Sequence, residues 1–158
     1  MEETTLAYLR REGKTLFLYR NRKKDDVNAG KWIGVGGHIE PGETPEECVR
    51  REVAEETGFT VLDARRRGVV RFISDSWEEV MHLYTVDSFG GEMRECDEGE
   101  LRWIPDERIP LLEKWEGDRV FLDLIASDAP FFRLTLRYEG DRLLSHETVF
   151  PETEGKDQ

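Results

Sequence analysis

The stretch 37–59 constrains this chain more than any other, because its residues mark both ends of a short helix. Thr44, Pro45 and Glu47 follow the capping-box pattern, with a hydroxyl N-cap, proline at the first helical position and glutamate three residues after the cap. Gly58 suits the left-handed backbone position just past a helix end. The sequence therefore predicts a helix between these marks, with a loop on each side.

The predicted helix carries an acidic face. At roughly 100° per residue, Glu52, Glu55 and Glu56 fall within one arc of about 100°. Like charges at this spacing repel, costing about 0.2–0.5 kcal/mol per pair on an exposed helix. A divalent cation would turn that cost into a binding site, since Mg²⁺ takes oxygen ligands and leaves room for substrate phosphates. The alternative is a solvated acidic face, which is common in a chain with 35 acidic residues.

The residues around the acidic face favour the metal site. Gly36 and Gly37 can present backbone carbonyls and bring the chain close to a ligand. Arg51 can pair with a neighbouring carboxylate and fix its direction.

Together these residues resemble the Nudix box, G-x5-E-x7-R-E-U-x-E-E-x-G-U, where U is a bulky aliphatic or aromatic residue. Its fixed positions are all filled, by Gly37, Glu43, Arg51, Glu52, Val53, Glu55, Glu56, Gly58 and Phe59. Members of this family cleave nucleoside diphosphates linked to another moiety, using Mg²⁺ or Mn²⁺. The resemblance implies that Glu52, Glu55 and Glu56 bind the metal, with a backbone carbonyl from Gly36 or Gly37.

Composition limits the partners. A net charge of −12 disfavours binding to a nucleic-acid polymer, which requires a basic surface. An acidic enzyme can still take an anionic nucleotide where bound metals reverse the local field. Cys48 and Cys96 have no metal-like spacing and are interpreted as reduced thiols of no special role.

No stretch resembles a signal peptide, and none is long enough to span a membrane. We therefore expect a cytoplasmic protein without membrane contact, as a monomer or weak homodimer.

The pattern of strands and helices predicts an α+β fold. Strands are expected at Thr5–Leu9, Thr15–Arg20, 31–37, within 59–74, and at 79–89, 101–104, 131–138 and 143–150, with a helical turn at 105–110 and a second helix at 117–127. The family resemblance sharpens this to a mixed β-sheet in an α/β/α sandwich, with the box as a loop-helix-loop. We expect one domain over residues 1–150 and a polar tail over 151–158.

Two further residues, Glu98 and Lys23, are candidates for the part of the site that binds the metal and the phosphates. Glu98 lies in an acidic segment whose spacing before Trp103 resembles that of the downstream glutamate of MutT-type enzymes, a metal ligand or a base. Lys23 lies in the basic run 20–24 and is the member favoured for phosphate contact. The alternatives are a surface loop for Glu98 and a solvated charged loop for Lys23.

A longer resemblance covers nearly the whole chain. The segments KWIGVGGHIEPGETPEEC, DEGELRWIP, KWEGD and PFFRLTLRYEGDRLL are similar to the MutX-type bacterial MutT-like enzymes and their animal counterparts, which destroy oxidised purine nucleoside triphosphates such as 8-oxo-dGTP. The resemblance implies that Trp115 stacks on the base and that Asp118 hydrogen-bonds the purine edge. It also implies that Phe72 and Met81 line the base pocket.

Two positions depart from the animal pattern. Animal relatives read the base with an asparagine where this chain has Ile33, and they place a second acid where it has Gly117. Base selectivity is therefore open, although the bacterial subset shares the WIG and WEGD patterns.

The expected reaction is metal-dependent hydrolysis of a purine nucleoside triphosphate to monophosphate and pyrophosphate, in nucleotide-pool sanitation. The closest alternative is a Nudix pyrophosphatase for nucleotide sugars, dinucleoside polyphosphates or coenzyme A. An alternative of another class is a non-catalytic nucleotide-binding module. Such modules usually lose box glutamates, whereas this chain keeps them all.

Overall fold

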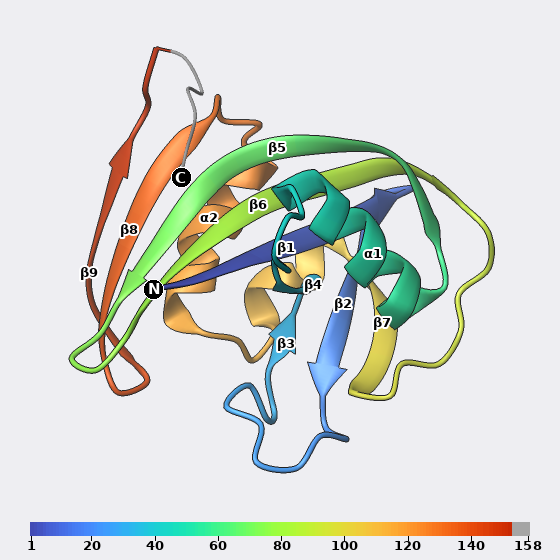
Figure 1. The fold of residues 1–158 in the computed structure, drawn as a ribbon, viewed down its shortest axis with the longest axis horizontal. Helices are drawn as coiled ribbons and strands as arrows, with labels where there is room; N and C mark the ends of the chain where they lie inside the picture. Colours follow the sequence, from blue (N-terminus) through green and yellow to red (C-terminus); the bar gives the residue numbers. More distant parts are fainter. Residues whose placement is uncertain (153–158) are drawn as a thin grey trace.

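The computed structural model describes residues 1–152 and shows a mixed β-sheet between two helices (Figure 1). The strands are β1 (Glu2–Arg11), β2 (Lys14–Arg20), β3 (Trp32–Ile33), β4 (Val35–His38), β5 (Thr60–Ile73), β6 (Glu78–Gly90), β7 (Gly99–Pro105), β8 (Phe132–Glu139) and β9 (Arg142–Val149). The helices are α1 (Pro45–Thr57), α2 (Glu116–Ala126) and the 3₁₀ helix η1 (Asp106–Leu111). Of the predicted tail, residues 153–158 lie outside the described part of the chain.

The sheet has a long part and a short part that meet at β1. In the long part the order is β4-β1-β6-β5-β8-β9, with the β1–β6 and β5–β8 pairs parallel. In the short part, β2 pairs with β7 along its whole length and with β1 and β3 at its two ends. Because β1 touches three neighbours, it lies at the centre of the fold.

Alternation along β1 builds the two sides of the sandwich, since successive side chains of a strand point to opposite faces. Leu6 and Tyr8 join the hydrophobic cluster that contains Phe121 and Ile125 of α2. Ala7 and Leu9 join the other cluster, whose helical members are Val49 and Val53 of α1. These are opposite faces of one sheet, so the predicted α+β sandwich is confirmed.

The ends of α1 follow from their local sequence. The Thr44 hydroxyl accepts a hydrogen bond from the Glu47 backbone N–H, and the Glu47 carboxylate accepts one from the Thr44 N–H. Gly58 ends the helix with φ of 86°, a value that glycine adopts readily and other residues rarely do. The predicted capping box and C-terminal glycine are both present.

The predicted strand over 31–37 is wrong in one respect, because the structure divides it into β3 and β4. β3 pairs with β2, whereas β4 pairs with β1. The chain changes partner at Gly34, where a Cβ atom would lie 2.9 Å from the Ala7 carbonyl oxygen. The close approach of two backbones therefore sets the break. No described helix is both long and apolar enough to cross a membrane.

Thr44→Ala is expected to lower the free energy of unfolding by about 1 kcal/mol, because the Glu47 N–H loses its cap. Urea unfolding followed by circular dichroism measures the change. Thr44→Ser keeps the hydroxyl and is the matched control, expected to unfold close to the wild type. Equal losses in the two variants would contradict a capping role.

Candidate active site

The three glutamates on the acidic face of α1 differ in their exposure to solvent. The Glu55 side chain is 59% exposed, the Glu52 side chain is 15% exposed, and Glu56 as a residue is 7% exposed. Burial raises the pKa of Glu52, and it raises the pKa of Glu56 to about 10. The three carboxyl groups share one face but differ strongly in their electrostatics.

Arg51 ties this face to the loop before α1. Its Nε donates to Glu43 at 2.7 Å, its Nη1 donates to Glu52 at 2.7 Å, and its Nη2 donates to the His38 carbonyl at 3.1 Å. The hydrogen bond from Arg51 lowers the pKa of Glu43 to about 2. Arg51 therefore fixes the direction of the Glu52 carboxylate and anchors the loop through Glu43.

Glu98 lies against the buried end of the acidic face. Its carboxyl group and that of Glu56 share a hydrogen bond, which raises the pKa of Glu56 and lowers that of Glu98. Two carboxyl groups held this close together repel each other when both are ionised, so they usually share one proton. Glu98 also lies 3.5 Å from Arg20 and 3.6 Å from Lys23, the predicted phosphate ligand.

The two glycines of β4 let the backbone approach the carboxylates. The Gly36 N–H donates to Glu56 Oε2 at 3.0 Å. A Cβ atom at Gly37 would lie only 2.6 Å from the Glu52 carboxyl carbon. The Gly37 carbonyl accepts a long hydrogen bond from the Cys48 thiol, at 3.7 Å. Both glycines thus pack on the acidic face, and at Gly37 a larger residue would prevent this contact.

Two neighbours of this site, Arg20 and Cys96, were not predicted from the sequence to belong to it. Arg20 is 8% exposed and bonds Asp26 at 2.7 Å, so it brings a buried positive charge beside Glu98. Cys96 is buried, and its sulfur lies with carboxylate oxygens of Glu56 and Glu98 in a group whose atoms are all within 4.8 Å of one another. No sequence spacing signals these contacts, because the pairing of β7 with β2 creates them.

The residues fit a divalent metal ion. The two carboxyl groups that share a proton, Glu56 and Glu98, could bind a cation in place of that proton, with Glu52 close to Gly37. Oxygen ligands of this kind suit a hard ion such as Mg²⁺ or Mn²⁺ better than a soft one.

The predicted base-binding residues gather on the other side of the sheet. Met81 is part of the cluster around α2, and Phe72 and Trp115 pack against it. Asp118 lies in the first turn of α2 and is 5% exposed. Ile33 is half-buried on β3 and belongs to neither hydrophobic cluster.

Two contacts orient the indole side chain of Trp115. Its indole N–H donates to Asn28 Oδ1 at 2.8 Å, and the Lys31 ammonium lies 4.5 Å from the ring centroid. A cation at this distance is attracted to the ring face. The Trp115 ring thus has Lys31 over one face, and the Tyr138 ring lies 5.8 Å from it, centroid to centroid, in a T-shaped arrangement.

The carboxyl group of Asp118 has a strongly raised pKa. Burial raises the pKa of its carboxyl group to about 7; the nearby Lys114 acts to lower it and Glu79 acts to raise it. Glu79 was not identified from the sequence, and its carboxylate accepts a hydrogen bond from Thr4 at 2.6 Å. It brings a second acid toward Asp118 from β6.

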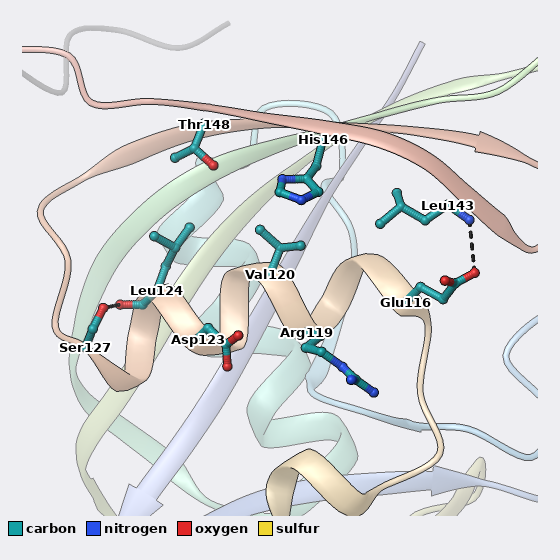
Figure 2. Close-up of a pocket in the computed structure, with 9 residues that line it drawn as sticks. All are labelled: Glu116, Arg119, Val120, Asp123, Leu124, Ser127, Leu143, His146 and Thr148. Atoms are coloured by element: carbon teal, nitrogen blue, oxygen red, sulfur yellow. Dashed lines mark hydrogen bonds between the residues drawn. The ribbon is translucent and has the colours of Figure 1, made fainter.

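A cleft of about 790 Å³ lies elsewhere, between α2 and β9 (Figure 2). Glu116, Arg119 and Asp123 line it from the helix, and His146 lines it from the strand. None of the predicted site residues lines this cleft, so the carboxyl groups on α1 and not the cleft define the candidate active site.

Comparison with known proteins assigns the family. The family model described as "NUDIX domain" matches residues 2–125. The chain belongs to the Nudix family. The zebrafish (Danio rerio) oxidized purine nucleoside triphosphate hydrolase is 32% identical over 146 residues, covering 90% of this chain and 91% of that protein. The mouse (Mus musculus) protein of the same description is 29% identical over 126 residues, covering 78% of this chain and 81% of that protein.

The solved structures agree with this assignment. The crystal structure of a MutT protein from Bacillus halodurans matches with a TM-score of 0.85 and 26% identity, covering 94% of this chain and 97% of that chain. The expected Nudix fold and the expected assignment to MutT-type Nudix hydrolases are confirmed. Nudix hydrolases generally use a divalent metal, in keeping with the acidic group around Glu56.

The raised pKa of Asp118 predicts how its contribution to stability depends on pH. Its carboxyl group has a pKa near 3.8 when unfolded and about 7 when folded, so ionisation in the folded state costs stability as the pH rises through this window. Relative to Asp118→Asn, the wild type should lose on the order of 2 kcal/mol of unfolding free energy between pH 5 and pH 8. Urea unfolding of both proteins at the two pH values measures this loss. The other acids are present in both proteins, so their contributions cancel in the difference between the two free energies of unfolding. A difference that does not change with pH would contradict the assignment.

Proposed function

We propose that this Nudix enzyme hydrolyses oxidised purine nucleoside triphosphates, such as 8-oxo-dGTP, to the nucleoside monophosphate and pyrophosphate. The observation that carries the proposal is the close pair of carboxyl groups of Glu56 and Glu98, with Glu52 nearby, beside a glycine backbone and two basic side chains. The similarity to proteins described as oxidized purine nucleoside triphosphate hydrolases supports the choice of substrate.

The proposed metal is Mg²⁺, with Mn²⁺ as a substitute. Its ligands would be Glu52, Glu55, Glu56 and Glu98, with a carbonyl of Gly36 or Gly37. When bound, the metal supplies charge neutralisation for the phosphates and activation of the attacking water.

This chain's own residues would perform the remaining steps. Arg51 holds Glu52 in place through a 2.7 Å hydrogen bond. Glu98, a carboxylate beside Arg20 and Lys23, would either bind the metal or accept a proton from the attacking water. Lys23, with its side chain 57% exposed, can reach a phosphate while staying near Glu98.

The proposed base site uses Trp115, Asp118, Phe72, Met81 and Ile33. The half-buried indole of Trp115 would stack on the purine, and the carboxyl group of Asp118 would bond its polar edge. Ile33 can offer only apolar contact. A site whose polar groups must pair with the substrate rejects bases that leave them unpaired.

The domain extent, the kind of substrate, the cellular location and the oligomeric state are also part of the proposal. Residues 1–150 are taken as one domain, because strands from β1 to β9 share one sheet. The net charge of −12 supports a free nucleotide as substrate in place of a nucleic-acid polymer or a membrane. We place the enzyme in the cytoplasm, as a monomer or weak homodimer.

Activity is expected to require Mg²⁺ or Mn²⁺ and to vanish in excess chelator. Glu55→Gln and Glu56→Gln should each lower kcat by about 10²-fold or more while the circular dichroism spectrum stays unchanged. Glu46→Gln is the matched control, because Glu46 lies exposed in the first turn of α1 and pairs with Arg50. Full turnover in chelator would exclude the metal mechanism.

Products distinguish the proposed reaction from its alternatives. Hydrolysis of 8-oxo-dGTP should release pyrophosphate and the monophosphate, measured by ion-exchange chromatography. Release of orthophosphate and diphosphate would refute this assignment. Faster hydrolysis of nucleotide sugars or dinucleoside polyphosphates than of any triphosphate would instead favour a Nudix pyrophosphatase of another substrate class.

A further inference from the structure

Tyr8, in the middle of β1, is a buried tyrosine whose hydroxyl group has no hydrogen-bond partner among the described residues. The residue is 1% exposed, and its ring packs against Phe17 and Phe121 with centroid distances of 5.2 and 6.4 Å. Phenylalanine would fill the same space without burying a polar atom. Because buried polar groups are nearly always hydrogen-bonded in folded proteins, the hydroxyl requires an explanation.

The surroundings of this hydroxyl are those of the proposed base site. Tyr8 and Met81 of the proposed base site belong to one buried hydrophobic cluster. Phe121, which contacts the Tyr8 ring, lies three residues after Asp118 on the inner face of α2. On the other side, a Cβ atom at Gly34 would lie 3.0 Å from Tyr8 Cε1, so the backbone next to Ile33 lies against the ring.

Asp118 lies one helical turn before Phe121 on α2, and it is also buried. Burial and the charges of Lys114 and Glu79 act on its carboxyl group. Tyr8 and Asp118 therefore bring a hydroxyl group, unpartnered among the described residues, and a buried carboxyl group to the same side of the sheet. A hydroxyl can donate and a carboxylate can accept, so the two together complement an edge that carries a carbonyl next to an N–H.

We propose that Tyr8 determines base specificity, its hydroxyl donating a hydrogen bond to the 6-carbonyl of a guanine-type base while Asp118 accepts one from the adjacent ring N–H. The inference rests on the proposed function and names a residue of that same site. It also explains how a site with apolar Ile33 distinguishes bases, because the second polar contact comes from β1. Adenine carries an amino group where guanine carries the carbonyl, so it loses the donated bond.

Tyr8→Phe tests this with the removal of one oxygen atom. Steady-state kinetics with 8-oxo-dGTP and dATP should show kcat/KM falling about tenfold for 8-oxo-dGTP and less than about threefold for dATP. Thermal unfolding should occur at the wild-type temperature or above it, because the variant buries one unpaired polar atom fewer. The matched control is Tyr84→Phe, a buried tyrosine in the cluster on the α1 side, which should leave the ratio of the two kcat/KM values unchanged.

Each other outcome overturns the inference. Equal losses for both substrates, or a lower unfolding temperature with a uniform loss, would assign Tyr8 to the core alone. An unchanged ratio in an active protein would reject the role of Tyr8 and leave the proposed function standing. A wild-type protein that hydrolyses neither triphosphate would remove the proposed function, and this inference with it.

Discussion

The catalytic side of this molecule depends on one guanidinium group. Arg51 bonds Glu43 in the loop before α1, Glu52 on the helix and the carbonyl of His38 at the end of β4. Through these bonds it joins three segments of the chain to one another. Without it, Glu52 would face the Gly37 backbone and the neighbouring acids with no compensating charge. Arginine suits this position because its planar fork can bond several oxygens in fixed directions, which the single ammonium of lysine cannot do.

The burial of Glu56 at the same site makes the folded protein less stable. A carboxyl group this deeply buried is costly to ionise, and in the metal-free protein it keeps a proton that it shares with Glu98. Arg20 offsets part of the cost, but it is already bonded to Asp26. In the proposed mechanism a cation would replace this proton. Strongly shifted groups of this kind gather at functional sites because the function supplies the missing partner.

The sequence predicted the features that depend on neighbouring residues. Thr44, Glu47 and Gly58 set the ends of α1 through contacts within a few residues, and the helical period places Glu52, Glu55 and Glu56 on one face. The differing burial of these glutamates was not predictable, because it comes from β4 and β7, which the sheet brings from elsewhere in the chain. The same applies to Arg20 and Cys96 beside Glu98, and to the change of strand partner at Gly34.

In the proposed reaction, β1 joins recognition of the base to catalysis. Tyr8 points toward α2 and the base site, while Thr5 points the other way and lies 3.2 Å from the Cys48 sulfur of α1. β4 pairs with this same strand, with Gly36 opposite Leu6 and Gly37 opposite Thr5. The separation between the base site and the acidic face is thus fixed by backbone pairing and not by a loop. A base seated in the wrong position would shift the phosphates relative to the metal ligands. Because small misplacements of reacting groups are costly, this coupling lets recognition of the base act on turnover as well as on binding.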